Sequence, residues 1–387
     1  MNRLPSLLVL LLSCSLAHGQ MQRLSTKWTG GVVNYGFQGG FGTSVEVFRA
    51  AMKYISNNTC IKFVENPSAS QRVIIAMDPG TACRSKVGAP GSRSSPHGLL
   101  FLEAGMCSNV LAIAVHELTH SLGSVHEHTR PDRDDFLWLN QSEINRRGLQ
   151  NDFVRAPYGM VPLYVPFEHA SNMGYEVSRW QNLGDAQLFG AYDPELEFSL
   201  GNSRITFFDM YRINKHYDCW CSNDNLPCAN QGFAHPADCS RCWCPMGWFG
   251  NLCDQRQPGA TSLKASTQWQ TATINHKFQS TDLNFRGFYS TYTYIDAPAD
   301  KKIQVKVEKM VGYNCQPGCN IQGIEIKTRV LANGDNRITS AILCCDNDRQ
   351  KQLRNKLFES TQHPTIIDTF SGWASNPSSV TISYRYV

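Results

Sequence analysis

The chain has 387 residues, a formal net charge of +4 and only 18% charged residues. Its length favours two or three domains over a single core, and one of them can be large enough for an enzyme. The weak, mixed charge argues against nucleic acid or an anionic membrane surface as a partner.

Residues 1–19 have the pattern of a secretory signal peptide. A basic Arg3 precedes an apolar run over 7–12, and small residues stand at Ala17 and Gly19, as a signal-peptidase site requires. The run is far shorter than the roughly 20 residues of a membrane span, and no later segment is long and apolar enough. We expect cleavage after Gly19 and a secreted, extracellular protein without a membrane span.

The cysteines predict a disulfide framework and a division of the chain. Of the 15 cysteines, Cys14 leaves with the signal peptide, so an even number remains in an oxidising compartment. Sequons at Asn57 and Asn140 fit glycosylation in that compartment. Cysteines are sparse, then crowded, then sparse again. We therefore predict three units, at 20–219, 220–254 and 255–387.

The first unit is predicted to be α+β. Residues 31–37 and 72–78 are β-branched and aromatic runs between turn residues, which is typical of strands. Residues 43–58 predict a helix, with Thr43 and Glu46 in capping-box spacing. The apolar stripe of this helix comprises Val45, Phe48, Met52 and Ile55.

Residues 108–123 predict a second helix, which places two histidines on one face. Ser108 is available as a cap, and Gly123 can end the helix. His116 and His120 are four residues apart, so both imidazoles can aim at one ion. The apolar positions of the helix are Leu111, Val115, Leu118 and Leu122.

The residues around this helix end predict a catalytic zinc site. Gly123 lets the chain turn back and brings His126 toward the same point. Three neutral imidazoles suit Zn²⁺ with an open position for water, and Glu117 can accept that water's proton. HExxH alone would occur in about one such chain in eighty, so Gly123 and His126 add much of the specificity. The spacing of His128 gives no reason to expect it to bind the metal, and we expect this residue to be exposed.

The remaining two units differ in kind. Residues 221–253 contain six cysteines. This span is too short to form an apolar core, so disulfides must stabilise its fold. The sequence leaves the pairing of these cysteines open. Residues 254–267 are polar and turn-rich, as in a linker or the entry to a new domain. From about residue 268 the pattern predicts an all-β sandwich. Its clearest strand candidates are 303–310, 324–331, 339–345 and 379–387.

Residues 116–134, HELTHSLGSVHEHTRPDRD, resemble the signature HExxHxxGFxHExxRxDRD of the astacin family of zinc metalloendopeptidases, which are metzincins. Ser124 stands where that family usually has Phe. The stretch from Cys244 to Cys253 resembles the closing hairpin of an EGF-like module. The third unit is similar to a CUB domain, with cysteines that depart from the usual spacing. The whole order resembles a nematode-type astacin over residues 23–387.

The resemblance implies roles for further residues. Met173, in SNMGY, would lie beneath the three imidazoles as the Met-turn. Tyr175 would ligate zinc at rest and then hydrogen-bond the oxyanion of the transition state. Glu127 would approach the buried N-terminus of the mature enzyme. A charge run would either form a solvated loop or brace the loop through a bonded network, which we favour, and it comprises Arg130, Asp132, Arg133 and Asp134.

The resemblance also implies disulfide pairs. They are Cys60 with Cys219, Cys83 with Cys107, Cys221 with Cys239, Cys228 with Cys242, and Cys244 with Cys253. The pairing of Cys315, Cys319, Cys344 and Cys345 stays open.

Two departures from the family concern latency and specificity. Astacins normally carry a pro-segment whose aspartate occupies the open zinc position, whereas Gln20 and the residues after it leave no room for one. We expect a mature N-terminus near Gln20. An N-terminal glutamine that cyclises loses its positive charge, and this would deprive Glu127 of a cationic partner. Asn202 or Ser203 takes the place where the family often has an arginine that selects acidic side chains, with Arg204 out of register. Substrate preference is therefore not carried over.

These observations favour a secreted endopeptidase with one catalytic Zn²⁺ that hydrolyses extracellular proteins. EGF-like and CUB-like modules would place it on substrate, matrix or a protein partner. The rival is a catalytically silent binding protein on the same scaffold, and a purely structural zinc is disfavoured by the presence of Glu117. A decayed enzyme commonly lacks a site residue, but this chain has them all: His116, Glu117, His120, His126, Met173 and Tyr175.

Overall fold

The computed structural model describes residues 27–39, 44–77, 84–89, 97–102, 110–159, 161–175, 186–222, 225–277, 288–346, 350–372 and 377–387. The expected signal peptide, Gln20, Thr43 and the pair Cys83 and Cys107 lie outside these residues. No helix within the described ranges is long and apolar enough to cross a membrane.

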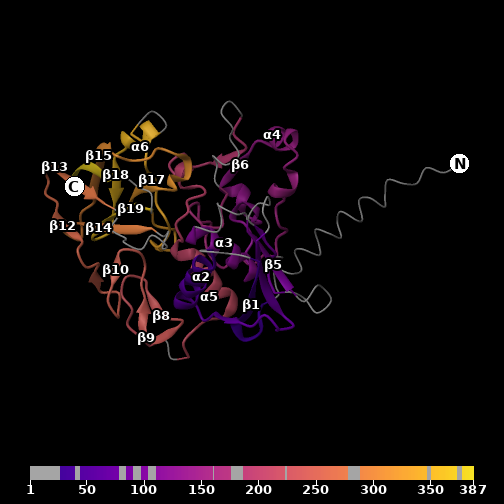
Figure 1. The fold of residues 1–387 in the computed structure, drawn as a ribbon. Coiled ribbons are helices and arrows are strands. Elements are labelled where there is room, and N and C mark those ends of the chain that lie inside the picture. The colour runs from indigo at the N-terminus through magenta and orange to yellow at the C-terminus, as the bar shows by residue number, and fades with distance from the viewer. Residues whose placement is uncertain are drawn as a thin grey trace.

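A five-stranded sheet forms one side of the N-terminal part (Figure 1). Its order is β2-β1-β3-β5-β4, and all neighbours run parallel except β4, which is antiparallel to β5. Two of the strands confirm the predictions at 31–37 and 72–78. The strands are β1 (Val32–Gln38), β2 (Lys62–Glu65), β3 (Arg72–Met77), β4 (Arg84–Ser85) and β5 (His97–Leu102).

Three helices supply the rest of this core. They are α2 (Ser44–Asn58), α3 (Leu111–Ser121) and α5 (Phe207–Tyr217). Both predicted apolar stripes face inward, and the buried cluster includes Phe48, Met52, Ile55, Val115, Leu118, Phe208 and Ile213. The prediction of Ser108 as the cap of α3 is wrong, because the helix begins later and Val110 stands at its N-cap without a side-chain bond.

A second cluster lies beyond α3. Strands β6 (Leu137–Leu139) and β7 (Phe189–Ala191) pair antiparallel next to α4 (Gln141–Arg146). Short 3-10 helices connect this region at η3 (Glu127–Thr129), η4 (Arg133–Asp135), η5 (Gln150–Phe153) and η7 (Glu197–Ser199), whereas η2 (Thr29–Gly31) directly precedes β1. Buried side chains here include Leu137, Ile144, Phe153, Phe167 and Phe189.

The middle part has little apolar core and is held by disulfides. Strands β8 (Phe233–His235) and β9 (Asp238–Trp243) form a hairpin, and β10 (Trp248–Phe249) pairs with β11 (Gln255–Arg256). The bridges are Cys221–Cys239, Cys228–Cys242 and Cys244–Cys253, the same pairs that the family resemblance implies. Cys60–Cys219 likewise closes the N-terminal part.

The C-terminal part is a sandwich of two sheets, as predicted. One sheet has the order β12-β14-β19-β16-β17 and the other β13-β20-β15-β18. The strands are β12 (Thr261–Lys264), β13 (Gln270–His276), β14 (Tyr289–Asp296), β15 (Ile303–Val311), β16 (Gln322–Ile326), β17 (Ile342–Leu343), β18 (Phe358–Ser360), β19 (Thr365–Ser371) and β20 (Ser378–Tyr386), with η8 (Pro317–Cys319) and α6 (Lys351–Arg354) between them. Apolar residues of both sheets share one core, and Cys315 pairs with Cys345 and Cys319 with Cys344.

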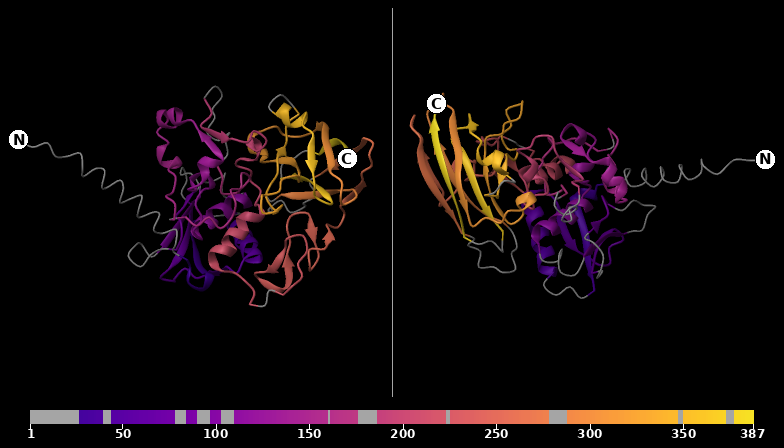
Figure 2. Two further views of the ribbon diagram at one scale, coloured as in Figure 1. Left: turned by 180° about the vertical axis from the view of Figure 1, so that it is seen from behind. Right: turned by 90° about the horizontal axis from the view of Figure 1, so that it is seen from above.

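The sandwich packs directly on the N-terminal part (Figure 2). Ile338 belongs to the N-terminal core cluster. Another buried cluster joins Ala170 and Phe198 to Ile342, Phe370 and both C-terminal disulfides. The predicted strand at 324–331 is shorter than expected, since β16 ends at Ile326 and the chain beyond it turns toward this interface.

Candidate active site

Three imidazoles converge beside the end of α3. His116 and His120 stand one turn apart on this helix, and Gly123, with φ of 108°, turns the chain back toward His126. The Nε2 atom of His126 lies 3.2 Å from that of His116 and 3.1 Å from that of His120. Nitrogens around a tetrahedral ion at about 2.0–2.1 Å are about 3.3 Å apart, so the spacing fits one Zn²⁺. These three are the candidate metal ligands among the described residues.

The tautomers of two imidazoles also favour a metal. His116 Nδ1 lies 2.6 Å from the carbonyl oxygen of Asn172, and His120 Nδ1 lies 2.7 Å from that of Ser124. A carbonyl only accepts, so each Nδ1 carries the proton and each Nε2 presents a lone pair. One proton on His126 could satisfy only one of these lone pairs at a time, whereas a cation satisfies both.

Burial keeps His120 neutral. The residue is 5% exposed, and desolvation, followed by the charge of His116, lowers its pKa to about 3. A neutral imidazole is the form that binds a metal, so this site favours the ion over a proton.

Glu117 and Tyr175 lie in the same region. Glu117 follows the first histidine on α3 and is 3% exposed. The ring of Tyr175 lies against His126, with 4.4 Å between the ring centroids. The structure therefore places the Tyr175 ring against one of the three histidines and Glu117 next to His116 on α3.

His128 corrects a prediction, because it is buried and not exposed. Only 2% of its surface is accessible, and its ring lies 3.9 Å from that of Tyr175 and 5.2 Å from that of His126. Its Nε2 lies 3.0 Å from the carbonyl oxygen of Asp152. The histidine thus fills the space behind the tyrosine. Burial lowers its pKa to about 3.

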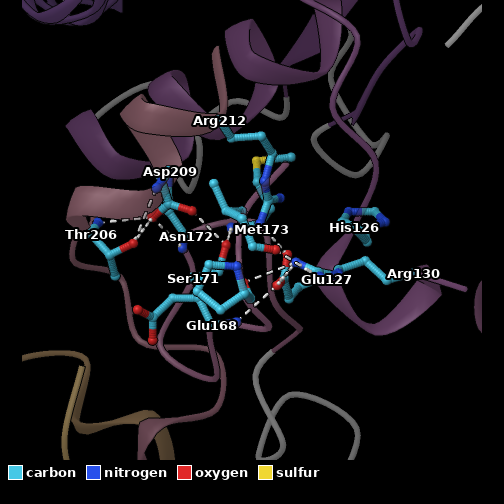
Figure 3. A network of polar contacts seen from close by, with 12 residues as sticks. His126, Glu127, Arg130, Glu168, Ser171, Asn172, Met173, Thr206, Asp209 and Arg212 are labelled. Carbon is cyan, nitrogen blue, oxygen red and sulfur yellow. Dashed lines mark hydrogen bonds and ion pairs between the residues drawn. The ribbon is translucent and has the colours of Figure 1, made fainter. Parts of the chain in front are cut away.

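The segment 171–173, which contains the expected Met-turn, is held between α3 and α5 (Figure 3). Asp209 accepts hydrogen bonds from Ser171 Oγ (2.5 Å) and the Asn172 backbone N–H (2.9 Å). The Asn172 side chain donates to the carbonyl of Ala112 on α3. Met173 is 1% exposed, and its carbonyl accepts from the N–H of Glu127. The turn is therefore fixed from both helices and from the chain next to His126.

Glu127 is neutralised by two arginines. Its carboxylate accepts from Arg130 at 2.9 Å and from Arg212 at 2.5 Å, and from the N–H of Glu168 at 2.9 Å. Burial opposes ionisation of Glu127, but the two guanidinium groups outweigh it, so its pKa is lowered. The expected contact with the N-terminus lies outside the described residues. The partner that sequence reasoning missed is Arg212, on α5.

The charge run after His126 forms the expected bracing network. Arg130 is 4% exposed and makes a bidentate pair with Asp132. Arg133 donates to the carbonyls of His128 and Phe153. These bonds fix the loop that follows His126.

Comparison with known proteins decides the family. Residues 20–218 match the family model of the astacin peptidases. The chain belongs to the astacin family. It is 41% identical to zinc metalloproteinase nas-24 of Caenorhabditis elegans over 95% of this chain and 88% of that protein. It is also 41% identical to zinc metalloproteinase nas-19 of the same organism, over 95% of this chain and 88% of that protein.

Among solved structures, a hatching enzyme zinc-protease of medaka fish, high choriolytic enzyme 1, covers 50% of this chain and 94% of its own, with 26% identity and a TM-score of 0.43. Because residues 20–218 match the astacin family model, the N-terminal part is an astacin-type metzincin domain, as the signature at 116–134 predicted. This astacin is a zinc-dependent metalloendopeptidase, and its histidine cluster fits the family's catalytic ion.

Proposed function

We propose that His116, His120 and His126 hold the catalytic zinc and that Glu117 is the general base. The observation that carries this assignment is the convergence of three Nε2 atoms, two of them with fixed tautomers. When bound there, zinc would polarise the substrate carbonyl and lower the pKa of a bound water to about 7.

The residues of this astacin divide the remaining work. Glu117 accepts the proton of the attacking water and then delivers it to the leaving amine. Tyr175 donates a hydrogen bond to the oxyanion that forms on the carbonyl carbon. His128, packed against the Tyr175 ring, limits where that ring can rest. Met173 keeps the turn beneath the imidazoles dry and closely packed.

We propose that the other two parts position the enzyme on its protein substrate or on the matrix. We assign 20–219 to the astacin domain, 220–254 to an EGF-like module and 255–387 to a CUB-like domain. The three disulfides within 221–253 and the two-sheet sandwich support these assignments. The modules would contact extracellular protein, either substrate or matrix.

Secretion and glycosylation belong to the same proposal. The disulfides and the pattern of 1–19 support an extracellular enzyme. Asn57 is exposed near the end of α2, which suits a glycan. Asn140 instead caps α4 through its side-chain oxygen, which accepts from the N–H of Glu143 at 3.2 Å. A glycan there would need the other atom of the amide.

Cleavage of a denatured protein by the purified secreted chain tests the assignment. We expect cleavage to stop with a zinc chelator and to return with added Zn²⁺. His120→Gln should lower bound zinc below one ion per chain, because one ligand is removed. Equal cleavage with and without the chelator would refute a zinc mechanism. Full zinc binding by His120→Gln would refute the ligand set. The silent-scaffold alternative receives no support from the relatives, which are themselves named metalloproteinases.

A further inference from the structure

The segment that precedes α5 is bound by the C-terminal sandwich. The Asn202 side chain donates to the carbonyl of Gly318 at 2.6 Å, and both the N–H and the hydroxyl of Ser203 donate to Asn320 Oδ1. Ser199 contacts the carbonyl of Ser340 at 3.5 Å. In the family resemblance, this stretch stands where a specificity residue is often found, yet here its polar groups are used by another part of the same chain.

Arg204 makes the charged connection between this segment and the sandwich. Its side chain is 6% exposed, and its guanidinium pairs with Asp368 on β19 and with Glu325 on β16, both of which are 0% exposed. The guanidinium also lies 4.2 Å from the centre of the Phe370 ring. Loss of a carboxylate partner would leave charge buried and uncompensated, which is strongly unfavourable, so this pairing joins Arg204 to the docked sandwich.

A second connection leads from the sandwich to the zinc site. Glu168 is 0% exposed. Its carboxylate accepts from the N–H of Thr339 at 3.1 Å and from the N–H of Ala170 at 3.2 Å. Its own N–H donates to the carboxylate of Glu127 at 2.9 Å, and Glu127 directly follows His126. Figure 3 shows Glu168 and Glu127 side by side below the Met-turn.

We propose that the C-terminal sandwich is a built-in support of the zinc site, and that Glu168 is the positioning residue through which its docking reaches Glu127 and His126. This inference rests on the proposed role of His126 as a ligand. The path has three bonded steps: Thr339 to Glu168, Glu168 to Glu127, and Glu127 to the carbonyl of Met173. Each step joins backbone to a buried carboxylate or to backbone, so little freedom remains between the sandwich and the zinc ligand.

The test compares full-length, zinc-loaded variants on a fixed peptide substrate. Glu168→Gln keeps the volume of the side chain but turns an amide N–H₂ toward one of the two backbone donors. Asp368→Asn weakens the pair with Arg204 from the sandwich side, far along the chain from any ligand. Asp300→Asn is the matched control, because Asp300 lies in the same part with a 76% exposed side chain.

Outer partners of metal ligands typically contribute about 10-fold to 100-fold to activity or metal affinity. We expect Glu168→Gln and Asp368→Asn to lower kcat about 10-fold, with KM within about twofold and faster loss of zinc to a chelator. Asp300→Asn should match the wild type. A purely structural role would lower the folded fraction and leave kcat per folded, zinc-loaded chain unchanged, and that result would overturn the proposal.

Asn320→Ala extends the test if either chain fails to fold, because it removes only the acceptor for Ser203. We expect a smaller fall in kcat, about threefold, on the scale of one lost neutral hydrogen bond. An unchanged kcat and zinc off-rate would contradict the support role. The wild-type chain, measured in parallel with the chelator, separates this outcome from failure of the zinc mechanism itself.

Discussion

Tyr175 illustrates how single side chains are prepared for one task. Its ring packs against both His126 and His128, and Phe153 lies at the edge of the same group. These contacts are made by the aromatic ring of Tyr175 and do not involve its hydroxyl. A phenylalanine at this position would therefore keep them. Removal of the hydroxyl should therefore affect the reaction far more than the fold.

Tyr175→Phe is expected to lower kcat about 100-fold, because one oxyanion donor is lost while the packing stays. Bound zinc and the unfolding temperature should remain close to those of the wild type. Steady-state kinetics and zinc analysis check this. Tyr158→Phe is the control, since Tyr158 is 64% exposed. Equal losses in both variants would show that the hydroxyl of Tyr175 has no special role.

The site was only partly predictable at the residue scale. Helical period alone placed His116 and His120 together, because local geometry fixes their faces. The buried state of His128 could not be read from its neighbours in sequence, since Tyr175 and Asp152 reach it from distant segments. The capping box of Thr206 and Asp209 was not predicted, and the bond from Asp209 that holds Asn172 depends on tertiary packing.

At the scale of elements, the end of α3 sets the site. The helix carries two of the three proposed ligands and ends at Ser121, and the backbone at Gly123 adopts a positive φ that only glycine adopts readily. That turn is what returns His126 to the helix. The sequence pattern predicted this use of glycine, whereas it misplaced the start of the helix, where no side-chain cap forms.

Gly123→Ala should destabilise the fold by about 1–3 kcal/mol, because a Cβ strains a backbone at φ of 108°. It should also weaken zinc binding at least about 10-fold, since His126 moves. Urea unfolding and chelator competition measure the two effects. Gly148→Ala is the matched control: its φ is 69° and nothing lies within 4 Å of an added Cβ. It should lose stability without losing zinc, and equal zinc loss in both would contradict the role given to Gly123.

At the scale of the whole molecule, three parts form one body. The disulfide-rich part contributes Trp243 to the N-terminal core, and the sandwich contributes Ile338. The order of the three units and the class of each could be predicted from cysteine density and strand patterns. Their mutual packing could not, because Arg204, Asp368 and Glu325 carry no sequence signal that pairs them across the chain.

Stability should fall in acid partly through His276, a buried residue of the sandwich. Its ring nitrogens contact Thr291 Oγ1 at 2.9 Å and Ser371 Oγ at 2.7 Å. Burial lowers its pKa from 6.5 to about 4. The unfolded chain therefore binds the proton more readily, so this stability is present above pH 6.5 and is lost as the pH falls toward 4.

The expected loss attributable to His276 is on the order of 3 kcal/mol between pH 6.5 and 4. This loss is measured by urea unfolding at several pH values. A zinc chelator is present in all samples, so that the zinc ligands are equally free of metal at each pH. His276→Gln should show a shallower slope over this window. Identical slopes in the two proteins would show that this histidine is already charged in the folded state or contributes nothing.

The central claim, that Glu117 is the base at a three-histidine zinc site, is tested most directly by one paired measurement on Glu117→Gln: bound zinc per chain and the rate of cleavage of a denatured protein. Glu46→Gln, at a carboxylate that is 65% exposed, is the control. We predict one zinc per chain in both variants, full cleavage by the control, and a loss of at least about 100-fold for Glu117→Gln. Cleavage by zinc-loaded Glu117→Gln at the control's rate would contradict the mechanism.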